Sequence, residues 1–142
     1  MRLEISRKAD LATRSLVALA AAGTTRKGAQ LAEELDASPG FLAQALTPLV
    51  AAGWISSVPG PTGGYSPRVA LAEVSVLQVI EAVEGPTDTA RCVLEGRACA
   101  AAGTTACALH VPWSRARATL LAELAATSLA DVAATADHRL EA

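Results

Sequence analysis

Residues 54–69 of the chain read WISSVPGPTGGYSPRV. The central PGPTGG cannot be helical, because proline lacks the backbone N–H that a helix uses and glycine favours turns. On either side, residues 54–58 and 65–69 combine apolar and hydroxyl side chains in short runs, which is typical of strands. The stretch therefore predicts a two-stranded antiparallel hairpin with a glycine-rich tip.

Two short helices are expected directly before this hairpin. The first spans residues 29–35, and its apolar side chains recur on one face. The second starts at Ser38-Pro39, since serine is a good N-cap and proline is favoured at the first helical position, and it ends before Gly53. Two short helices joined by a tight turn predict a helix-turn-helix, and the hairpin that follows is then a wing.

Three further helices are expected. Residues 6–22 have apolar side chains at helical spacing, and residues 75–84 open on Ser-x-x-Gln, the form of a capping box. Residues 110–126 form a long helix with Trp113, Leu120 and Leu124 on one stripe. Because we expect this helix to have no partner within the chain, we assign it to a dimer interface.

The pattern predicts a mainly α fold with a small β wing, a winged helix-turn-helix followed by a long C-terminal dimerisation helix. We expect a DNA-binding domain over residues 1–85, a cysteine-containing loop over 86–107, and the dimerisation helix with a C-terminal tail over 108–142. The composition agrees, because a chain that is 51% apolar but 3% aromatic, with alanine dominant, favours closely packed helices.

The charge distribution, the apolar runs and the motifs of the sequence limit the classes of function that we expect. The net charge is −2, but residues 1–75 carry seven basic and six acidic side chains, against five and eight in the rest, which favours an N-terminal DNA reader. The longest apolar run, residues 16–22, is shorter than the ~20 residues of a membrane span, so we expect a cytoplasmic protein. With two histidines and no phosphate loop or nucleophile elbow, we expect no enzyme.

The candidate DNA contacts follow from the helix-turn-helix, in which the first residues of the second helix meet base edges. Gln44 fits an adenine edge and Phe41 a thymine methyl group, although both are also compatible with ordinary surface or core positions. In the helix the candidates are Ser38, Gly40, Phe41 and Gln44. In the wing they are Ser57, Gly63, Gly64, Tyr65 and Arg68.

The three cysteines, Cys92, Cys99 and Cys107, have the spacing C-x6-C-x7-C. An odd number in a reducing compartment argues against a disulfide framework, and their place in a loop argues against core packing. Nearby Arg91 and Arg97 favour the ligating thiolate form. We predict metal ligation, with a metal-free thiol sensor and a structural zinc loop as alternatives. Three thiolates leave an iron–sulfur cluster one ligand short.

The sequence resembles the winged-helix iron–sulfur regulators, the family that includes IscR and NsrR. The match covers nearly the whole chain. Its stretches are DLATRSL at 10–16, FLAQ at 41–44 with AG at 52–53, SVPGPTGGY at 57–65, VIEAVEG at 79–85, the cysteine loop, and SLAD at 128–131. The chain departs from the family at Pro59, where family wings usually carry an arginine that contacts DNA, and at Ala43, where glutamate is frequent.

The resemblance implies a fourth cluster ligand and a mode of regulation. In one branch of the family, an aspartate at the position of Asp10, supplied by the partner subunit, completes a [4Fe–4S] cluster. In another, a histidine at the position of His110 ligates a [2Fe–2S] cluster. We expect Asp10, with His110 as the alternative. The implied function is a homodimeric repressor on an inverted-repeat operator in double-stranded DNA, switched by nitric oxide, redox state or iron supply; a metal-free thiol redox sensor is the alternative.

Overall fold

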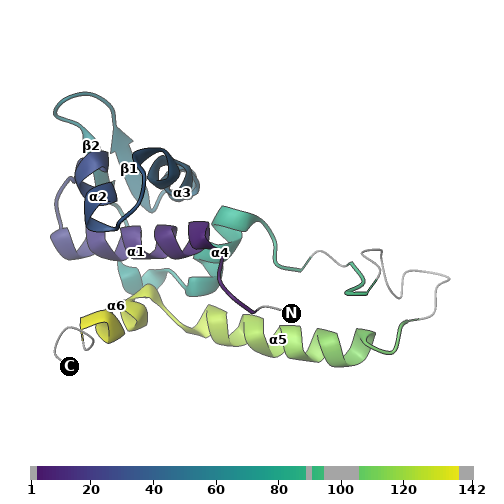
Figure 1. The fold of residues 1–142 in the computed structure, drawn as a ribbon. Helices are drawn as coiled ribbons and strands as arrows, with labels where there is room; N and C mark the ends of the chain where they lie inside the picture. Colours follow the sequence, from purple (N-terminus) through teal and green to yellow (C-terminus); the bar gives the residue numbers. More distant parts are fainter. Residues whose placement is uncertain (1–2, 89–90, 95–105, 138–142) are drawn as a thin grey trace.

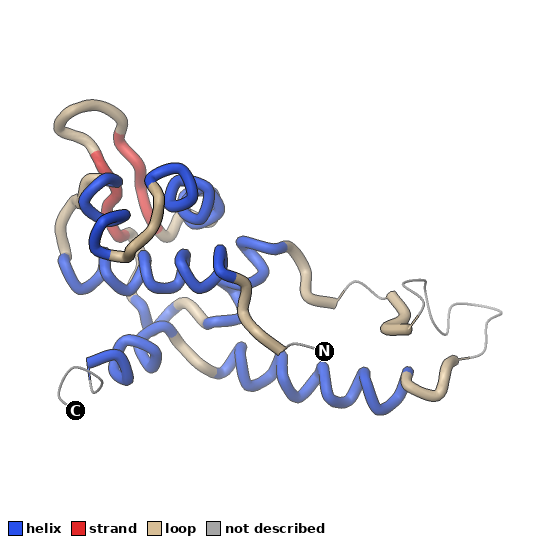
Figure 2. Tube along the Cα trace, in the orientation of Figure 1, coloured by secondary structure: helices blue, strands red, loops and turns tan. Residues whose placement is uncertain are grey.

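The computed structural model describes residues 3–88, 91–94 and 106–137 (Figure 1). Helices dominate, and the two strands form one small hairpin (Figure 2). The elements in chain order are α1 (Arg7–Ala22), α2 (Gly28–Glu34), α3 (Pro39–Ala51), β1 (Ile55–Val58), β2 (Gly64–Pro67), the short 3-10 turn η1 (Leu71–Glu73), α4 (Val76–Glu84), α5 (His110–Ala126) and α6 (Leu129–Asp137).

Helix α1 is the centre of the fold and lies between the helix-turn-helix and α4 (Figure 1). It begins where the Ser6 hydroxyl accepts a hydrogen bond from the amide of Ala9 at 3.2 Å, and ends at Gly23, whose φ is +63°. Burying an aliphatic side chain contributes roughly 1.5–3 kcal/mol, so the helices are held mainly by their shared core. The largest fully buried apolar residues are Leu11, Leu16, Leu19, Leu31, Leu42, Leu46, Leu49, Ile55, Val74, Val79 and Leu129.

The helix-turn-helix agrees with the sequence prediction to within about a residue at each end. The Ser38 hydroxyl caps α3 by accepting from the amide of Phe41 at 3.2 Å. The turn between α2 and α3 contains Asp36 with φ +51°, a left-handed conformation that aspartate tolerates better than most residues. The cap fixes where α3 begins and therefore which of its faces turns outward.

The wing is the predicted hairpin, but each strand is one residue shorter than expected, and the second begins at Gly64 and ends at Pro67. The strands are antiparallel, and their register pairs Ile55 with Pro67 and Val58 with Gly64. Arg26 extends the hairpin as an isolated bridge, since its amide donates to the Tyr65 carbonyl at 2.9 Å and its carbonyl accepts from the Tyr65 amide at 2.8 Å. This bridge anchors the base of the wing to the segment before α2.

The C-terminal part differs from the expectation. Residues 129–137, which were expected in a C-terminal tail, form α6 instead, and this helix buries Leu129 completely in the core. The amide of Leu129 donates to the Val74 carbonyl at 2.8 Å, which ties the start of α6 to the segment before α4. Helix α5 (Figure 1) also has a partner within the chain, because it packs on α4. Leu124 of α5 is half-buried against the core.

Within the described part of the chain, no helix has the length and apolar character needed to span a membrane.

Candidate nucleic-acid interface and cysteine pocket

Helix α3 presents a continuous outward face. Gly40, Ala43, Gln44 and Thr47 recur at helical spacing and are all exposed, whereas the opposite face is buried in the core. The predicted contacts Ser38, Gly40 and Gln44 therefore lie on the surface, at the start of a well-capped helix. Ala43 and Thr47 complete the same face. Neither residue is among the DNA contacts predicted from the sequence, although their helical spacing from Gly40 indicates the same face.

Phe41 is placed differently from its neighbours on α3. Its side chain is half-buried and packs against the hydrophobic core, so most of the ring serves the fold. A thymine contact by Phe41 would use the remaining exposed part. The sequence left open whether Phe41 is a core or a surface residue, and its surroundings are mostly those of a core residue.

The wing residues divide into surface and packing positions. Ser57 and Arg68 are exposed, and the Arg68 Nε donates to the Ser56 hydroxyl at 3.1 Å. Gly63 is buried, and a Cβ at this position would lie 1.9 Å from the Val58 carbonyl oxygen. A Cβ at Gly64 would lie 2.4 Å from the Arg26 carbonyl oxygen. Both glycines therefore have a packing reason that is independent of DNA.

Tyr65, the remaining wing candidate, is half-buried against the core. Its ring comes within 3.3 Å of the place where a Cβ on Gly28 would stand. The side chain therefore joins the wing to the start of α2.

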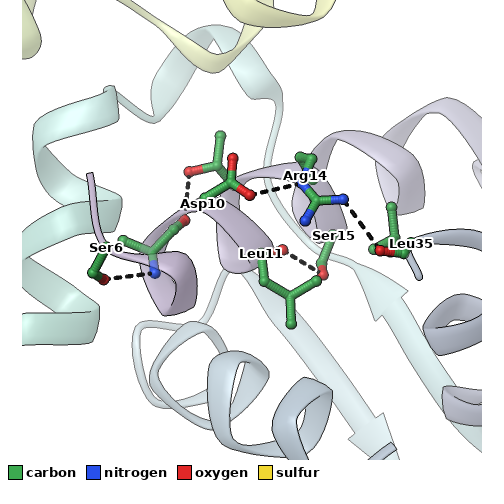
Figure 3. A network of polar contacts seen from close by, with 8 residues as sticks. Ser6, Asp10, Leu11, Arg14, Ser15 and Leu35 are labelled. Carbon is green, nitrogen blue, oxygen red and sulfur yellow. Dashed lines mark hydrogen bonds and ion pairs between the residues drawn. The ribbon is translucent and has the colours of Figure 1, made fainter. Parts of the chain in front are cut away.

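Asp10 belongs to a polar network that reaches the helix-turn-helix (Figure 3). Its carboxylate accepts from the Arg14 Nε at 2.9 Å, and the Arg14 guanidinium also donates to the Leu35 carbonyl at 3.2 Å. Leu35 ends α2, where a nearby cation is favoured by the unpaired carbonyl groups of the helix terminus. Arg14 thus connects the start of α1 with the turn before α3.

A cavity of about 200 Å³ lies where the cysteine segment meets the start of α5. Cys92 is buried, Cys107 is half-buried, and their Sγ atoms are 3.7 Å apart. The amide of His110 donates to the Cys107 carbonyl at 3.0 Å, so Cys107 is fixed against the first turn of α5. The lining residues are Asp88, Arg91, Cys92, Val93, Cys107, His110, Trp113, Ser114 and Arg117.

The distance between the two sulfur atoms tests which chemistry the pocket fits. A disulfide would require about 2.05 Å, much shorter than the 3.7 Å found. Two thiolates on one tetrahedral ion with metal–sulfur bonds of about 2.3 Å lie roughly 3.8 Å apart. The 3.7 Å spacing of Cys92 and Cys107 therefore matches a thiol–thiol hydrogen bond, and it also matches two sulfur ligands of a single metal ion, such as one iron of a [2Fe–2S] cluster. Thiolate and imidazole donors suit iron.

The third predicted cysteine ligand, Cys99, and the nearby Arg97 lie outside the described residues. Within the described ranges, no three cysteine, histidine or acidic side chains are close enough together to hold a metal ion. The metal-ligating residue types that the structure brings to one cavity are Cys92, Cys107, His110 and Asp88, of which Asp88 is paired with Arg117.

The two candidate fourth ligands lie in different places. His110 lines the cavity of Cys92 and Cys107, whereas Asp10 lines a separate groove with Ser38 and Phe41 at the start of α3. Within one chain, His110 is therefore the candidate beside the sulfur atoms. Asp10 would have to come from a second copy.

One face of α5 lines the cysteine pocket, a role that was not predicted from the sequence. His110, Trp113 and Arg117 follow each other at helical spacing, and Arg117 forms an ion pair with Asp88 at 2.6 Å. Trp113, which was expected on the apolar stripe of this helix, lines the cavity. The ion pair joins the segment after α4 to α5, a long-range contact that local periodicity does not reveal.

A capped outward-facing helix, a preceding short helix and a glycine-tipped hairpin define the chain as a winged-helix protein. Its residues 5–135 match the family model named Rrf2, described as an iron-dependent transcriptional regulator. The chain belongs to the Rrf2 family. It is therefore a transcriptional regulator and not an enzyme, and its family implies DNA binding.

Related sequences agree with this assignment. A protein of Mycobacterium tuberculosis named as an HTH-type transcriptional regulator is 35% identical over 133 residues, covering 92% of this chain and 81% of the relative. The HTH-type transcriptional regulator IscR of Vibrio atlanticus is 35% identical over 85 residues, which are 60% of this chain and 47% of that protein.

Solved structures show the same fold. An oxidised form of Staphylococcus aureus CymR has a TM-score of 0.69 and 28% identity, and the match covers 92% of this chain and 96% of that one. IscR of T. potens has a TM-score of 0.69 and 22% identity, covering 94% and 88%. CymR of B. subtilis, named as the global cysteine regulator, has a TM-score of 0.75 and 24% identity, covering 94% and 98%.

Proposed function

We propose that this chain is a cytoplasmic, homodimeric repressor whose affinity for an inverted-repeat operator is switched by an iron–sulfur cluster. The observation that carries the proposal is that Cys92, Cys107 and His110 line one cavity, with the two sulfur atoms 3.7 Å apart. Cys99, in the same loop by sequence, is the third proposed ligand. The signal is nitric oxide, redox state or iron supply.

The proposed ligands come from two elements that the cavity joins. Cys92 belongs to the segment after α4, and Cys107 precedes the first turn of α5. A cluster bound by the two sulfur atoms would hold this segment against α5, and loss of the cluster would release the segment. When bound, the cluster supplies iron that reacts with nitric oxide or oxidants.

The fourth ligand decides how the pocket communicates with DNA. If it is Asp10 of the partner subunit, that carboxylate is also the partner of Arg14, which contacts the turn before α3. Binding of the Asp10 carboxylate to iron would then compete with its ion pair to Arg14. The contact of Arg14 with the turn before α3, the proposed DNA-recognition helix, would change as a result. If it is His110, the site is closed within one chain and acts on DNA through α5 and the dimer.

The DNA interface in this proposal consists of the outward face of α3 and the wing. Gln44 meets base edges, Ser38 and Gly40 lie at the start of α3, and exposed Ser57 and Arg68 face the sugar–phosphate backbone. Two such units related by a two-fold axis favour an inverted repeat with half-sites about 34 Å apart.

A metal-free thiol sensor is the second candidate function. It is supported by the similarity to a CymR structure described as an oxidised form. In this chain, the Cys92 and Cys107 sulfur atoms would have to approach by about 1.7 Å from their separation of 3.7 Å to form a disulfide. The two functions therefore predict different products at the same pair of sulfur atoms.

The test is purification without oxygen, followed by a visible spectrum and the ratio of iron to sulfide. The proposal expects brown protein with iron and sulfide, lost in Cys92→Ala, Cys99→Ala and Cys107→Ala. Val93 lines the same cavity and has no side-chain atom that could bind iron, so Val93→Ala is the matched control and should stay brown. Colourless wild-type protein that cannot be reconstituted would contradict the cluster and favour the thiol sensor.

The same preparation identifies the fourth ligand. His110→Ala and Asp10→Ala should be compared for the rate at which a chelator removes iron. Faster loss in His110→Ala alone indicates ligation within one chain, and faster loss in Asp10→Ala alone indicates ligation across the dimer. Unchanged rates in both variants would exclude both residues as ligands.

A further inference from the structure

Helix α3, the proposed DNA-recognition helix, has few side chains that can form hydrogen bonds. Residues 39–51, all of them described, carry no charged side chain, and Gln44 and Thr47 are the only polar ones. Gln44 therefore offers the one side-chain amide along the outward face of α3. Arginine and lysine, the residues that most often read guanine, do not occur on this helix.

The rest of the outward face is small and apolar. The Thr47 hydroxyl donates to the Ala43 carbonyl at 2.8 Å, so the hydroxyl points back along the helix and the methyl group is left for a partner. The methyl group of Ala43 lies one turn earlier on the same exposed face. A Cβ added at Gly40 would meet no described atom within 4 Å, so this end of α3 is open to a close approach.

Each kind of group on this face has a matching base edge. A glutamine amide bonds to N6 and N7 of adenine with both of its polar atoms, and alanine and threonine methyl groups contact the 5-methyl group of thymine. Phe41, the other candidate for a thymine contact, is half-buried in the core. The side chains on the outward face of α3 are therefore complementary to A·T base pairs.

We propose that α3 reads A·T pairs in each half-site, with Gln44 bonded to an adenine and the methyl groups of Ala43 and Thr47 against neighbouring thymine methyl groups. Guanine is not read by this helix. The inference rests on the proposed DNA interface and adds the base composition that the interface selects.

The first test selects duplexes from a random pool with the full-length wild-type protein and with Gln44→Ala. Positions whose base preference disappears in the variant are those that Gln44 reads, and we expect A·T pairs there. Affinity for the wild-type consensus should fall about 5- to 150-fold per half-site. Identical selections and affinities would contradict the proposed interface itself. Disappearance of a preference at a G·C pair would leave the interface standing and overturn the A·T inference.

The second test replaces thymine by deoxyuridine in both half-sites of the selected duplex. This change keeps the hydrogen-bonding edges and removes only the 5-methyl groups. We expect roughly three- to fourfold weaker binding for each thymine methyl group that α3 touches in a half-site. Equal affinity for the thymine and deoxyuridine duplexes would overturn the methyl contacts.

Two variants of Thr47 separate its methyl group from its hydroxyl. Thr47→Ser keeps the hydroxyl that bonds to Ala43 and removes the methyl, so it should weaken binding to the thymine duplex but not further weaken binding to the deoxyuridine duplex. Thr47→Val keeps the methyl and should bind like wild type. Weak binding by Thr47→Val together with normal binding by Thr47→Ser would assign the contact to the hydroxyl and contradict the inference.

Discussion

At the scale of single residues, Gly63 has the tightest surroundings of the wing glycines. A Cβ there would meet the Val58 carbonyl oxygen at 1.9 Å, so either the backbone of β1 or the wing tip would have to move. We expect Gly63→Ala to lower the free energy of unfolding by about 1–3 kcal/mol, measured by urea denaturation.

Gly40→Ala is the matched control for this prediction. Its added Cβ would meet no described atom within 4 Å, and alanine is favoured over glycine in a helix by roughly 0.5–1 kcal/mol. This variant should be as stable as wild type or more stable. Equal stability of Gly63→Ala and Gly40→Ala would contradict the packing assigned to the wing.

Residue-level roles were only partly accessible from the sequence. Ser38 and Gln44 were placed correctly on the surface, because a serine–proline helix start fixes the phase of the helix that follows. Phe41 could not be placed, since an aromatic side chain at the edge of an apolar stripe is compatible with the core or the surface. Gly63 and Gly64 were selected for DNA, but their neighbours Val58 and Arg26 become visible only once the hairpin is closed.

At the scale of elements, the start of α6 gives a pH-dependent prediction. The Asp131 carboxylate accepts from the Ser128 hydroxyl at 2.7 Å and from the Ser128 amide at 2.8 Å. These hydrogen bonds, the one from the side chain foremost, hold the pKa of Asp131 below its ordinary value of 3.8. A lowered pKa in the folded state means that the ionised carboxylate stabilises the fold above the ordinary pKa.

We therefore expect wild type to be more stable than Asp131→Asn at pH 7. The difference should disappear as the pH falls through the pKa of Asp131 in the folded protein, because the protonated acid loses these hydrogen bonds. Urea denaturation of both proteins from pH 7 to about pH 2.5 measures it, within the range where the fold persists. A difference in unfolding free energy that is the same at every pH would contradict the cap.

The elements were more predictable where their determinants are local. The capping box of α4 was read from Ser75 and Gln78, and both of its hydrogen bonds are present. Helix α6 was missed although Ser128 and Asp131 form a similar cap, because its stability depends on burying Leu129 beside Val74, far away in the sequence. The pairing of Arg117 with Asp88 was missed for the same reason.

At the scale of the whole molecule, an apolar groove lies where the N-terminal segment meets α4 and α5. Leu3, Ile5 and Leu120 line it, and they are 75%, 48% and 44% exposed. A homodimer that covers this groove would explain such exposure. We expect Leu120→Glu to raise the dimer dissociation constant about tenfold or more, because a charge would enter an apolar contact.

The dimer dissociation constant of Leu120→Glu can be measured by analytical ultracentrifugation. Ala122→Glu, an exposed position two residues further along α5 and outside the groove lining, is the control and should remain dimeric. Loss of the dimer in both variants would point to added charge on α5 in general. A dimer that survives Leu120→Glu would exclude this groove as the interface.

Control of DNA binding by the cluster is tested most directly by measuring the affinity of one protein preparation for its operator before and after its iron is removed. Protein purified without oxygen is titrated with the duplex selected from the random pool, then again after chelation under the same salt conditions. If the cluster controls DNA binding, affinity should fall about 5- to 150-fold on loss of iron, the range of a coupling of ~1–3 kcal/mol. Equal affinity of the two forms would contradict a cluster that controls DNA binding.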